Sequence, residues 1–587
     1  WPRISAFAGI IIAIFMILVS IYFTPHFIES HISPDGIIEK SETILIINGC
    51  RLLTAIIGIL TLLLSIIRPN FFYSVTNVLA QRSLKERTEQ ITLGKSHFSN
   101  KVISLLCCII ILGSLLRFYG LDNQSLWNDE LASQFKSNQT NLSEVINIGV
   151  RHDVHPPGYH ILLYFVEKYI GDSESVLRLP SAISGALSIF IIFLLGVRLY
   201  SYKEGLIASM LIAVSWCPIF YSQEARSYSL LLLFSLLATY FWIVLIKALD
   251  EESKLSCYST VGYIIFSIIL CYLHYFGLYL IGLQGLATLL FFILKRKKLI
   301  PIILVYFIIV IFYVPWLPIF WEHLHKATIH ITQPTTVTFI HYLKFLFNRS
   351  FVLVSIVLIL FFLLFYVNLI IFIKLRKYRT TRALVLSADL FLLLWLVIPF
   401  AGVFIESILS VSVFTTRNLI ISLPAAYLLL SRSITQFHFS SRKLATVSIV
   451  IACFLLFHLI YVMNYYSKAH KGQFREAVSY IVEKDRVYKD SLIVGWAWNK
   501  SFFDYYFQRN CSNRRVDILA GRENDISLLA NAIRLKSPKY IWYVSGHRVP
   551  DIGFINFLNK ELALVVQKQF VGAKVWLFKN KVFYEDI

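Results

Sequence analysis

Two adjacent carboxylates, Asp129 and Glu130, are the residues of this sequence best suited to acid–base chemistry. They end a polar stretch, 117–130, that directly follows the apolar run 102–116. Neighbouring residues on a helix or strand point in different directions, so one carboxylate can face a cavity while the other anchors the loop. A carboxylate partly desolvated at a membrane interface has a raised pKa and can accept a proton from a hydroxyl group. The pair equally fits a helix start, with Asn128 or Asp129 as the cap and Glu130 near the positive end.

Further residues that could bind a ligand lie in polar segments between later apolar runs. The segment 152–155 (His-Asp-Val-His) places three metal-binding side chains within four positions, although without another well-spaced ligand such a cluster is more often a polar loop. Arg226 suits a phosphate at the level of lipid headgroups, because a guanidinium fork matches phosphate oxygens. An interfacial arginine paired with Glu224 explains the same pattern. Other polar residues at the ends of apolar segments are Tyr221, His155, His274 and Arg417.

The composition indicates that a membrane must position these residues. Of 587 residues, 57% are hydrophobic and 15% are charged, whereas a soluble protein carries roughly 25% charged residues. The sequence therefore predicts a polytopic α-helical membrane protein. We expect no nucleic-acid partner from the net charge of +21, because in a membrane protein the positions of Lys and Arg are more informative than their sum. The eight cysteines are scattered, with neither a disulfide framework nor a metal-type spacing.

Hydropathy predicts thirteen segments able to cross a membrane. Their approximate limits are 4–23, 43–67, 102–116, 180–199, 204–220, 228–248, 259–273, 276–294, 300–320, 350–373, 384–407, 417–431 and 444–465. Basic residues cluster in alternate connections, which the positive-inside rule places in the cytosol. These basic connections are 82–87, 198–203, 295–298, 374–382 and 432–443.

This orientation gathers the candidate residues on one face. It places outside the first external loop (117–179), the turn 221–227, the loop 321–349 and the tail after Tyr466. The candidates on this outer face are Asp129, His155, Arg226, His274 and Arg417. Unrelated interfacial polar residues would divide between the two faces. Within the first loop, 159–170 is too short to span and predicts a helix at the membrane surface.

The tail from 467 to 587 has the composition of a soluble module. The segments that predict strands are 491–496, 540–544, 562–566 and 573–578. Between them, 523–535 predicts a helix, so a small α/β domain is expected. The chain then divides into an N-terminal pair of helices with a cytosolic linker (1–101), a transmembrane domain (102–466) and this external domain (467–587).

Several different short motifs follow one another along 102–280. They are Arg117 to Asp129-Glu130, His155-Pro-Pro-Gly-Tyr159, Glu174-Ser-Val-Leu-Arg178-Leu-Pro-Ser181, Gly185, Tyr221-Ser-Gln-Glu-Ala-Arg226-Ser-Tyr228 and Leu273-His274-Tyr-Phe-Gly277. In this order the region resembles the conserved half of the GT-C membrane glycosyltransferases, in the branch with protein O-mannosyltransferases, aminoarabinose transferases and Rgt-type core transferases. The spans before Val102 depart from the simplest members. Beyond about residue 300, only hydropathy, Thr416-Arg417-Asn-Leu and Pro424 match.

The resemblance implies a GT-C fold and a polyprenyl-phosphate-linked sugar donor used on the non-cytosolic face. It assigns the role of catalytic base to Asp129, with Glu130 as an orienting group. It assigns donor-phosphate binding to Arg226 and Arg417. We expect an inverting single displacement, in which the base takes the proton of the acceptor hydroxyl and polyprenyl phosphate leaves.

The resemblance also places a catalytic cavity in the domain 102–466. The other residues expected around this cavity are His155, Tyr221, Glu224 and His274. No cofactor is certain, but His274 and His155 could hold a divalent metal ion. The expected location is the inner (plasma) membrane, with the site on the periplasmic or extracellular face.

Two other functions fit parts of the pattern. A flippase or transporter of lipid-linked sugar would also have many spans, but its ionisable site is expected at mid-membrane and its spans in inverted repeats. An O-antigen ligase or polymerase would centre on a large loop nearer the C-terminus. For the transferase, the expected partners are the lipid bilayer, a polyprenyl-phosphate-sugar, hexosyl or pentosyl, and a glycolipid, glycan or protein acceptor.

Overall fold

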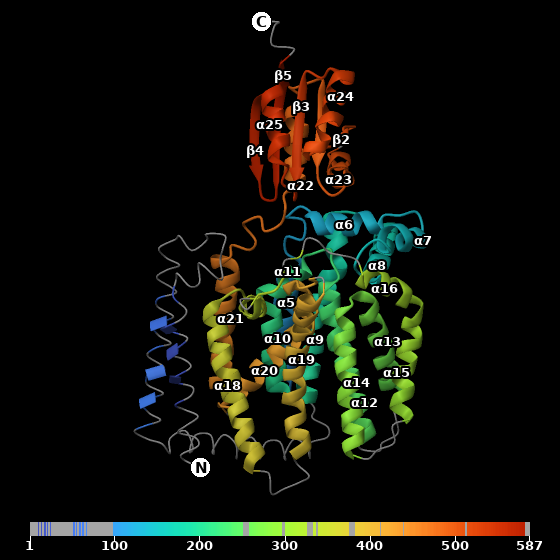
Figure 1. The fold of residues 1–587 in the computed structure, drawn as a ribbon. Coiled ribbons are helices and arrows are strands. Elements are labelled where there is room, and N and C mark those ends of the chain that lie inside the picture. The colour runs from blue at the N-terminus through green and yellow to red at the C-terminus, as the bar shows by residue number, and fades with distance from the viewer. Residues whose placement is uncertain are drawn as a thin grey trace.

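In the computed structural model, a bundle of long helices carries a small sheet domain at one end (Figure 1). The structure describes residues 98–581, apart from gaps at 251–256, 296–299, 326–330, 375–381 and 511–512 and at positions 332, 336, 337, 411 and 438. Before residue 98 it describes only scattered positions, so the predicted spans 4–23 and 43–67 lie outside the described residues.

Within the described part of the chain, nine helical segments are long and apolar enough to cross a membrane, or ten when one bent pair is counted as a span. Unbroken spanning helices are α5 (Asn100–Phe118), α9 (Glu174–Leu199), α12 (Tyr228–Asp250), α14 (Phe276–Lys295), α18 (Phe351–Lys374) and α19 (Arg382–Leu409). Spans built from consecutive helical pieces are α15 (Ile300–Tyr313) with α16 (Leu317–Leu324), the 3-10 turn Thr416–Ser422 with α20 (Leu423–Thr435), and α21 (Ser441–Phe457) with the π turn His458–Val462. The shorter apolar helix α13 (Cys257–Leu273) completes the bundle. The polytopic helical class is confirmed, and a helix occupies each predicted span from 102 onward.

The predicted span 204–220 is broken in the structure. It forms α10 (Tyr202–Val214) and α11 (Trp216–Ser222), which meet at an angle of 58°. Ser215 between them has an extended backbone. Pro218 has no N–H to donate to the carbonyl four residues earlier, which favours a break at this point. The break leads the chain into the segment 223–227, which belongs to the candidate site.

A buried arginine closes the end of α10. Arg117 is fully buried and donates to the carbonyl oxygens of Gly113 at 2.8 Å, Ile212 at 2.7 Å and Ala213 at 3.1 Å. The carbonyls at a helix C-terminus lack intrahelical partners, so the guanidinium satisfies groups that burial would otherwise leave without hydrogen bonds. Arg117 thereby fixes α5 against the bend that precedes the site.

The contact between α9 and α11 at Gly185 supports a stability prediction. A Cβ at Gly185 would lie 1.9 Å from Ser222 Oγ and 2.9 Å from Arg117 Nε. We expect Gly185→Ala to lower the free energy of unfolding by about 1–3 kcal/mol through overpacking, measured by thermal unfolding in detergent. Gly282→Ala is the matched control, because no atom lies within 4 Å of its added Cβ. Equal losses in both variants would contradict the packing argument.

Short helices form a layer between the bundle and the sheet domain (Figure 1). They include α6 (Asn128–Ser137), α7 (Leu142–Glu144), the π turn Val145–Val150 and α8 (Gly158–Tyr169). The helix predicted at 159–170 is confirmed as α8. A further short helix, α17 (Thr338–Leu346), precedes α18.

The C-terminal part contains a five-stranded sheet in the order β2-β1-β3-β5-β4. Its strands are β1 (Ser491–Trp496), β2 (Ile518–Leu519), β3 (Tyr540–Gly546), β4 (Leu562–Phe570) and β5 (Ala573–Asn580). The four predicted strands are confirmed, and β2 was missed because its two residues leave no period to detect. Strand β1 runs parallel to β2 and β3, whereas β5 pairs antiparallel with β3 and β4.

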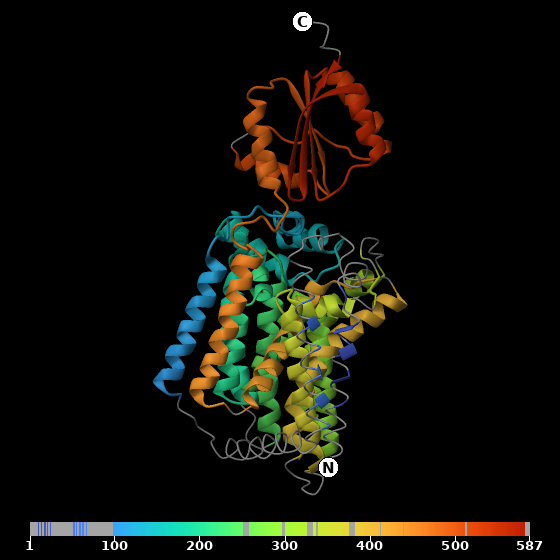
Figure 2. The same cartoon turned by 90° about the vertical axis from the view of Figure 1, so that its left-hand side faces the viewer.

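Helices cover both faces of this sheet (Figure 2). On one face α22 (Phe474–Asp485) and α23 (Ser501–Arg509) bury a core with Ile493, Trp542 and Val544. On the other face α24 (Ile526–Lys536) and α25 (Ile552–Glu561) pack on the alternate strand residues. The predicted helix 523–535 is confirmed as a 3-10 turn, Glu523–Asp525, followed by α24.

Polar contacts fasten α23 to the layer below. Tyr506 accepts a hydrogen bond from the N–H of Leu126 at 2.6 Å and donates to Glu174 at 2.6 Å. Tyr505 donates to the carbonyl oxygen of Asp172 at 2.8 Å. The sheet domain therefore touches the loop that carries Asp129 and Glu130.

Candidate active site

Glu130 is the centre of a buried ion cluster. Its side chain has no exposed surface, and Arg178 donates hydrogen bonds to both carboxylate oxygens, at 2.8 and 2.7 Å. Oε1 also accepts the N–H of Ala225 at 2.7 Å, and Oε2 lies 3.2 Å from Lys471 Nζ. These cations lower the pKa of Glu130 to about 2, although burial raises it. Glu130 therefore carries a fixed negative charge that holds its surroundings together.

Asp129 is the accessible member of the pair. Its side chain is 18% exposed and forms an ion pair with Arg417. Its other oxygen accepts a hydrogen bond from Asn128 at 3.2 Å. Burial raises the pKa of Asp129, but the charges of Arg417 and Arg226 outweigh burial and lower it to about 2. Asp129 is thus an ionised carboxylate that a ligand could reach once Arg417 moves.

Helix α6 explains why the two carboxylates diverge. They occupy its first turn, and Glu130 accepts a hydrogen bond from the N–H of Trp127 at 3.4 Å, in a capping-box arrangement. The helix start expected from the sequence is present with Glu130 near its positive end, but the cap is Trp127, so the prediction of Asn128 or Asp129 as the cap is wrong. Asp129, one residue earlier, points elsewhere and remains available.

Arg226 lies beside Asp129 without forming the ion pair to Glu224 that the sequence also allowed. It donates to Ser133 Oγ at 3.1 Å, and its other terminal nitrogen lies 3.2 Å from His155 Nε2. An arginine can only donate, so His155 Nε2 accepts and its Nδ1–H donates to Asp153 at 3.1 Å. Burial lowers the pKa of His155, consistent with this neutral form.

The histidines do not assemble a metal site in the described part of the chain. There, no group of three or more His, Cys, Asp or Glu side chains has the arrangement to hold a metal ion. Both ring nitrogens of His155 are engaged, as described above. The Nδ1 atom of His274 accepts the N–H of Phe276 at 3.2 Å, and its ring packs 5.9 Å from that of His155. Among the described residues, His155 and His274 thus do not form the donor set of a metal ion.

Glu224 is a buried side chain next to Trp127. Its Oε1 accepts a hydrogen bond from the indole N–H of Trp127 at 2.9 Å, and the side chain has no exposed surface. Burial raises the pKa of Glu224, against the opposing charge of Lys471. Trp127 therefore links Glu224 to the helix turn that carries Asp129.

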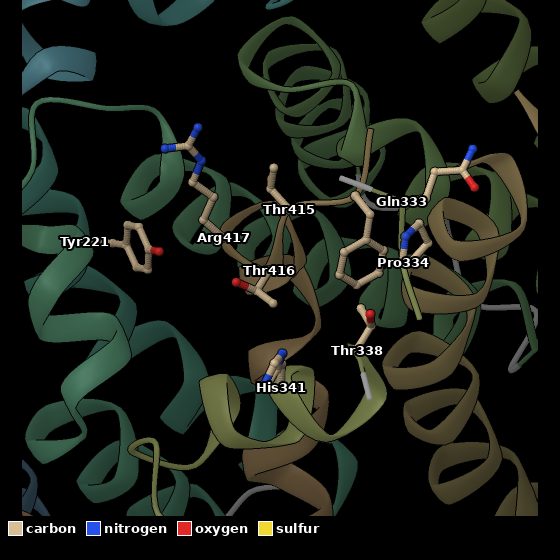
Figure 3. A pocket seen from close by; sticks show the side chains of 9 residues that line it. Tyr221, Gln333, Pro334, Thr338, His341, Thr415, Thr416 and Arg417 are labelled. Atoms are coloured by element: carbon tan, nitrogen blue, oxygen red, sulfur yellow. The ribbon is translucent and has the colours of Figure 1, made fainter. Parts of the chain in front are cut away.

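A cavity of about 410 Å³ opens beside Arg417. Its lining residues are Tyr221, Gln333, Pro334, Thr338, His341, Phe414, Thr415, Thr416 and Arg417. Tyr221 faces it from the side opposite Gln333 and Pro334, and the Arg417 guanidinium lies at its rim (Figure 3). Because Arg417 also pairs with Asp129, this one side chain connects the cavity to the carboxylate.

Lys471 and Trp127 were missed by the sequence analysis. Lys471 is 4% exposed and donates to the carbonyl oxygen of Gln223 at 2.5 Å as well as approaching Glu130. In the sequence it stands in an ordinary polar linker, 467–472, after the last span. Only the tertiary contacts reveal it, since nothing in the composition separates it from other linker lysines.

The fold and the site together define a polytopic membrane protein with an ionic centre at the end of its helix bundle, beneath a sheet domain. Residues 154–319 match the family described as dolichyl-phosphate-mannose-protein mannosyltransferase. No curated protein sequence matches the chain.

Solved structures share the fold over most of this chain. Apo ArnT from Cupriavidus metallidurans is 12% identical with a TM-score of 0.51, over 81% of this chain and 98% of its own. The same protein bound to undecaprenyl phosphate gives 12% identity and a TM-score of 0.51, over 82% and 98%. At this identity the likeness shows the fold. Together with the family match over residues 154–319, it confirms the GT-C fold expected from the sequence.

Proposed function

We propose that this protein transfers a sugar from a polyprenyl-phosphate-linked donor to an acceptor hydroxyl, with inversion, on the non-cytosolic face of the membrane. The observation that carries the proposal is the ion pair between Asp129 and Arg417 at the rim of the cavity. The pair supports the proposal because a carboxylate and a guanidinium, whose fork matches phosphate oxygens, lie within one ligand's reach. The shared fold of ArnT bound to undecaprenyl phosphate supports the class of donor.

The reaction assigns one task to each charged group. Asp129 accepts the proton of the acceptor hydroxyl as its oxygen forms a bond to the anomeric carbon. The bond from that carbon to the phosphate oxygen breaks on the opposite face, so the configuration inverts. Polyprenyl phosphate leaves with the electron pair, and Arg417 and Arg226 stabilise its charge. Phosphate is a good leaving group, so no general acid is required.

Arg417 has two roles in this scheme. Without donor it neutralises Asp129, and with donor bound its guanidinium is shared with the phosphate. This sharing weakens the attraction that lowers the pKa of Asp129, and burial then raises that pKa. The donor thereby makes Asp129 a stronger base only when there is a sugar to transfer.

A pH profile tests this coupling. Above about pH 4, we expect kcat/KM of the wild-type protein to show no loss from protonation of Asp129, whose pKa in the free protein is about 2. In Arg417→Gln, burial is offset only by Arg226 and the Asn128 hydrogen bond, so the pKa of Asp129 rises and the acid limb should move to higher pH. Arg151→Gln, which removes an exposed cation elsewhere, is the control. Coincident acid limbs in wild type and Arg417→Gln would contradict the role of Arg417.

Donor turnover separates the proposal from its alternatives. A transferase releases polyprenyl phosphate stoichiometrically with the glycosylated product, whereas a flippase moves the lipid-linked sugar and releases none. The measurement uses purified protein in vesicles with radiolabelled donor on one side. Translocation of intact donor without release would overturn the proposed function.

A further inference from the structure

The parallel strands of the C-terminal sheet end at one edge. Because β1 runs parallel to β2 and β3, the segments that follow them, beginning at Ala497, Ala520 and His547, gather there. In open α/β sheets, ligands bind in the crevice outside the carboxyl ends of the strands. A ligand of this domain would therefore bind at this edge.

Two tryptophans and two arginines cluster at this edge. The Arg548 guanidinium lies 3.9 Å from the ring centre of Trp498 and 5.0 Å from that of Trp496. Arg522 lies 5.8 Å from the Trp496 ring. The Trp496 indole rests against Gly521, where a Cβ would come within 2.2 Å of the ring. The glycine thus lets the indole lie close to the backbone, while Trp498 remains 47% exposed.

Both guanidinium groups lack an ion pair with a carboxylate in the described part of the chain. The nearby acids serve the backbone instead: Asp525 accepts the N–H groups of Gly521 and Arg522, at 3.0 and 2.9 Å. Asp551 accepts the N–H of Glu523 at 3.3 Å. Burial and the charge of Arg522 lower the pKa of Arg548. An anion between the two arginines would relieve their mutual repulsion.

This cluster adjoins the active site through one loop. His547, next to Arg548, packs its ring 6.2 Å from that of Trp127. Trp127 lies two residues before Asp129 and is hydrogen-bonded to Glu224. The loop that carries Arg548 therefore contacts the segment that carries Asp129.

We propose that Trp498, Arg522 and Arg548, packed on the buried Trp496, form an acceptor subsite that binds an anionic saccharide. The exposed indole of Trp498 suits the apolar C–H face of a sugar ring, and guanidinium forks bind the carboxylate or phosphate groups of such a glycan. The proposal rests on the proposed transferase function and names its acceptor class. It also assigns a task to the domain 467–587: it holds the acceptor above the base.

Calorimetric binding of trigalacturonate to the full-length protein in phosphatidylcholine nanodiscs tests the subsite. We expect measurable binding by the wild type, and a loss of about tenfold or more when both arginines are removed in R522Q/R548Q. Trp498→Ala should weaken binding as well. The matched control is R534Q/K560Q, which removes the same charge from other helices of this domain and should bind like the wild type. Neutral maltotriose should bind more weakly than trigalacturonate.

Several results would overturn the subsite: no binding by the wild type, equal binding by R522Q/R548Q, or equal binding of maltotriose. The wild type could instead bind phosphatidylglycerol vesicles but no saccharide, with weaker vesicle binding by R522Q/R548Q. The cluster would then be a lipid contact, and this result would also overturn the subsite. Donor turnover keeps the two proposals distinct. Transfer that survives Asp129→Asn would defeat the proposed mechanism, whereas unchanged saccharide binding by R522Q/R548Q would defeat only the subsite.

Discussion

Replacing Asp129 with asparagine is expected to lower kcat for sugar transfer by about 10²–10⁴-fold, the range that a positioned general base contributes. Asparagine keeps the shape of the side chain and the start of α6, but it cannot take the proton of the acceptor hydroxyl. Arg417 loses its carboxylate partner in this variant. Its full charge is then available to the donor phosphate, so the donor should bind as tightly as in the wild type or more tightly. The measurements are single-turnover transfer and donor affinity.

The control for this variant is Asp122→Asn. Asp122 lies in the same loop, is exposed, and provides a backbone carbonyl, not its carboxylate, to Arg475. Its loss of charge should leave kcat unchanged. A folded Asp129→Asn protein that transfers sugar at the wild-type rate would show that another group accepts the proton. Donor affinity that collapses together with kcat would instead assign Asp129 to donor binding.

The different roles of Asp129 and Glu130 could be predicted from the sequence only in part. Adjacent positions on a helix must diverge, so the sequence indicated that one acid anchors and the other faces a cavity. The structure adds that Glu130 anchors through Arg178 and Lys471, which are 48 and 341 residues away. Lys471 could not be found from pattern, because its role depends on how the linker 467–472 folds back onto the bundle.

Most of the fold followed from hydropathy, because every span must bury about twenty apolar residues in lipid whatever its neighbours are. The bend at Ser215 was not foreseen. Pro218 is compatible with a bend but does not by itself predict one, because proline is tolerated within membrane helices, as at Pro180 inside α9. The N–H of Trp216, freed by the bend, donates to the Asn348 side chain at 2.9 Å, a partner that hydropathy cannot supply.

The second large effect concerns stability. We expect Arg178→Met to lower the free energy of unfolding by about 3–5 kcal/mol, because removing one partner of a buried ion pair leaves the charge of Glu130 with Lys471 as its remaining cation. Arg178 also donates to the carbonyl oxygens of Leu121, Gln124 and Ser125, at 2.6, 2.7 and 3.0 Å. The substitution therefore releases the loop that places Asp129, and kcat should fall even at temperatures where the variant remains folded. Thermal unfolding and transfer assays on the same preparation measure both effects.

An exposed ion pair provides the comparison that isolates burial. Arg151 pairs with Glu322 at 3.0 Å, with the two side chains 46% and 45% exposed, so Arg151→Met should cost about 0.2–1 kcal/mol. Arg178→Lys should restore the stability only in part. An ammonium restores the charge, but it cannot donate hydrogen bonds to both oxygens of Glu130 and to three carbonyl oxygens at once. If Arg178→Met proved no less stable than Arg151→Met, the cluster around Glu130 would not be what holds the loop. Asp129 would then owe its position to Arg417 alone, and Arg417→Gln would become the variant that displaces it.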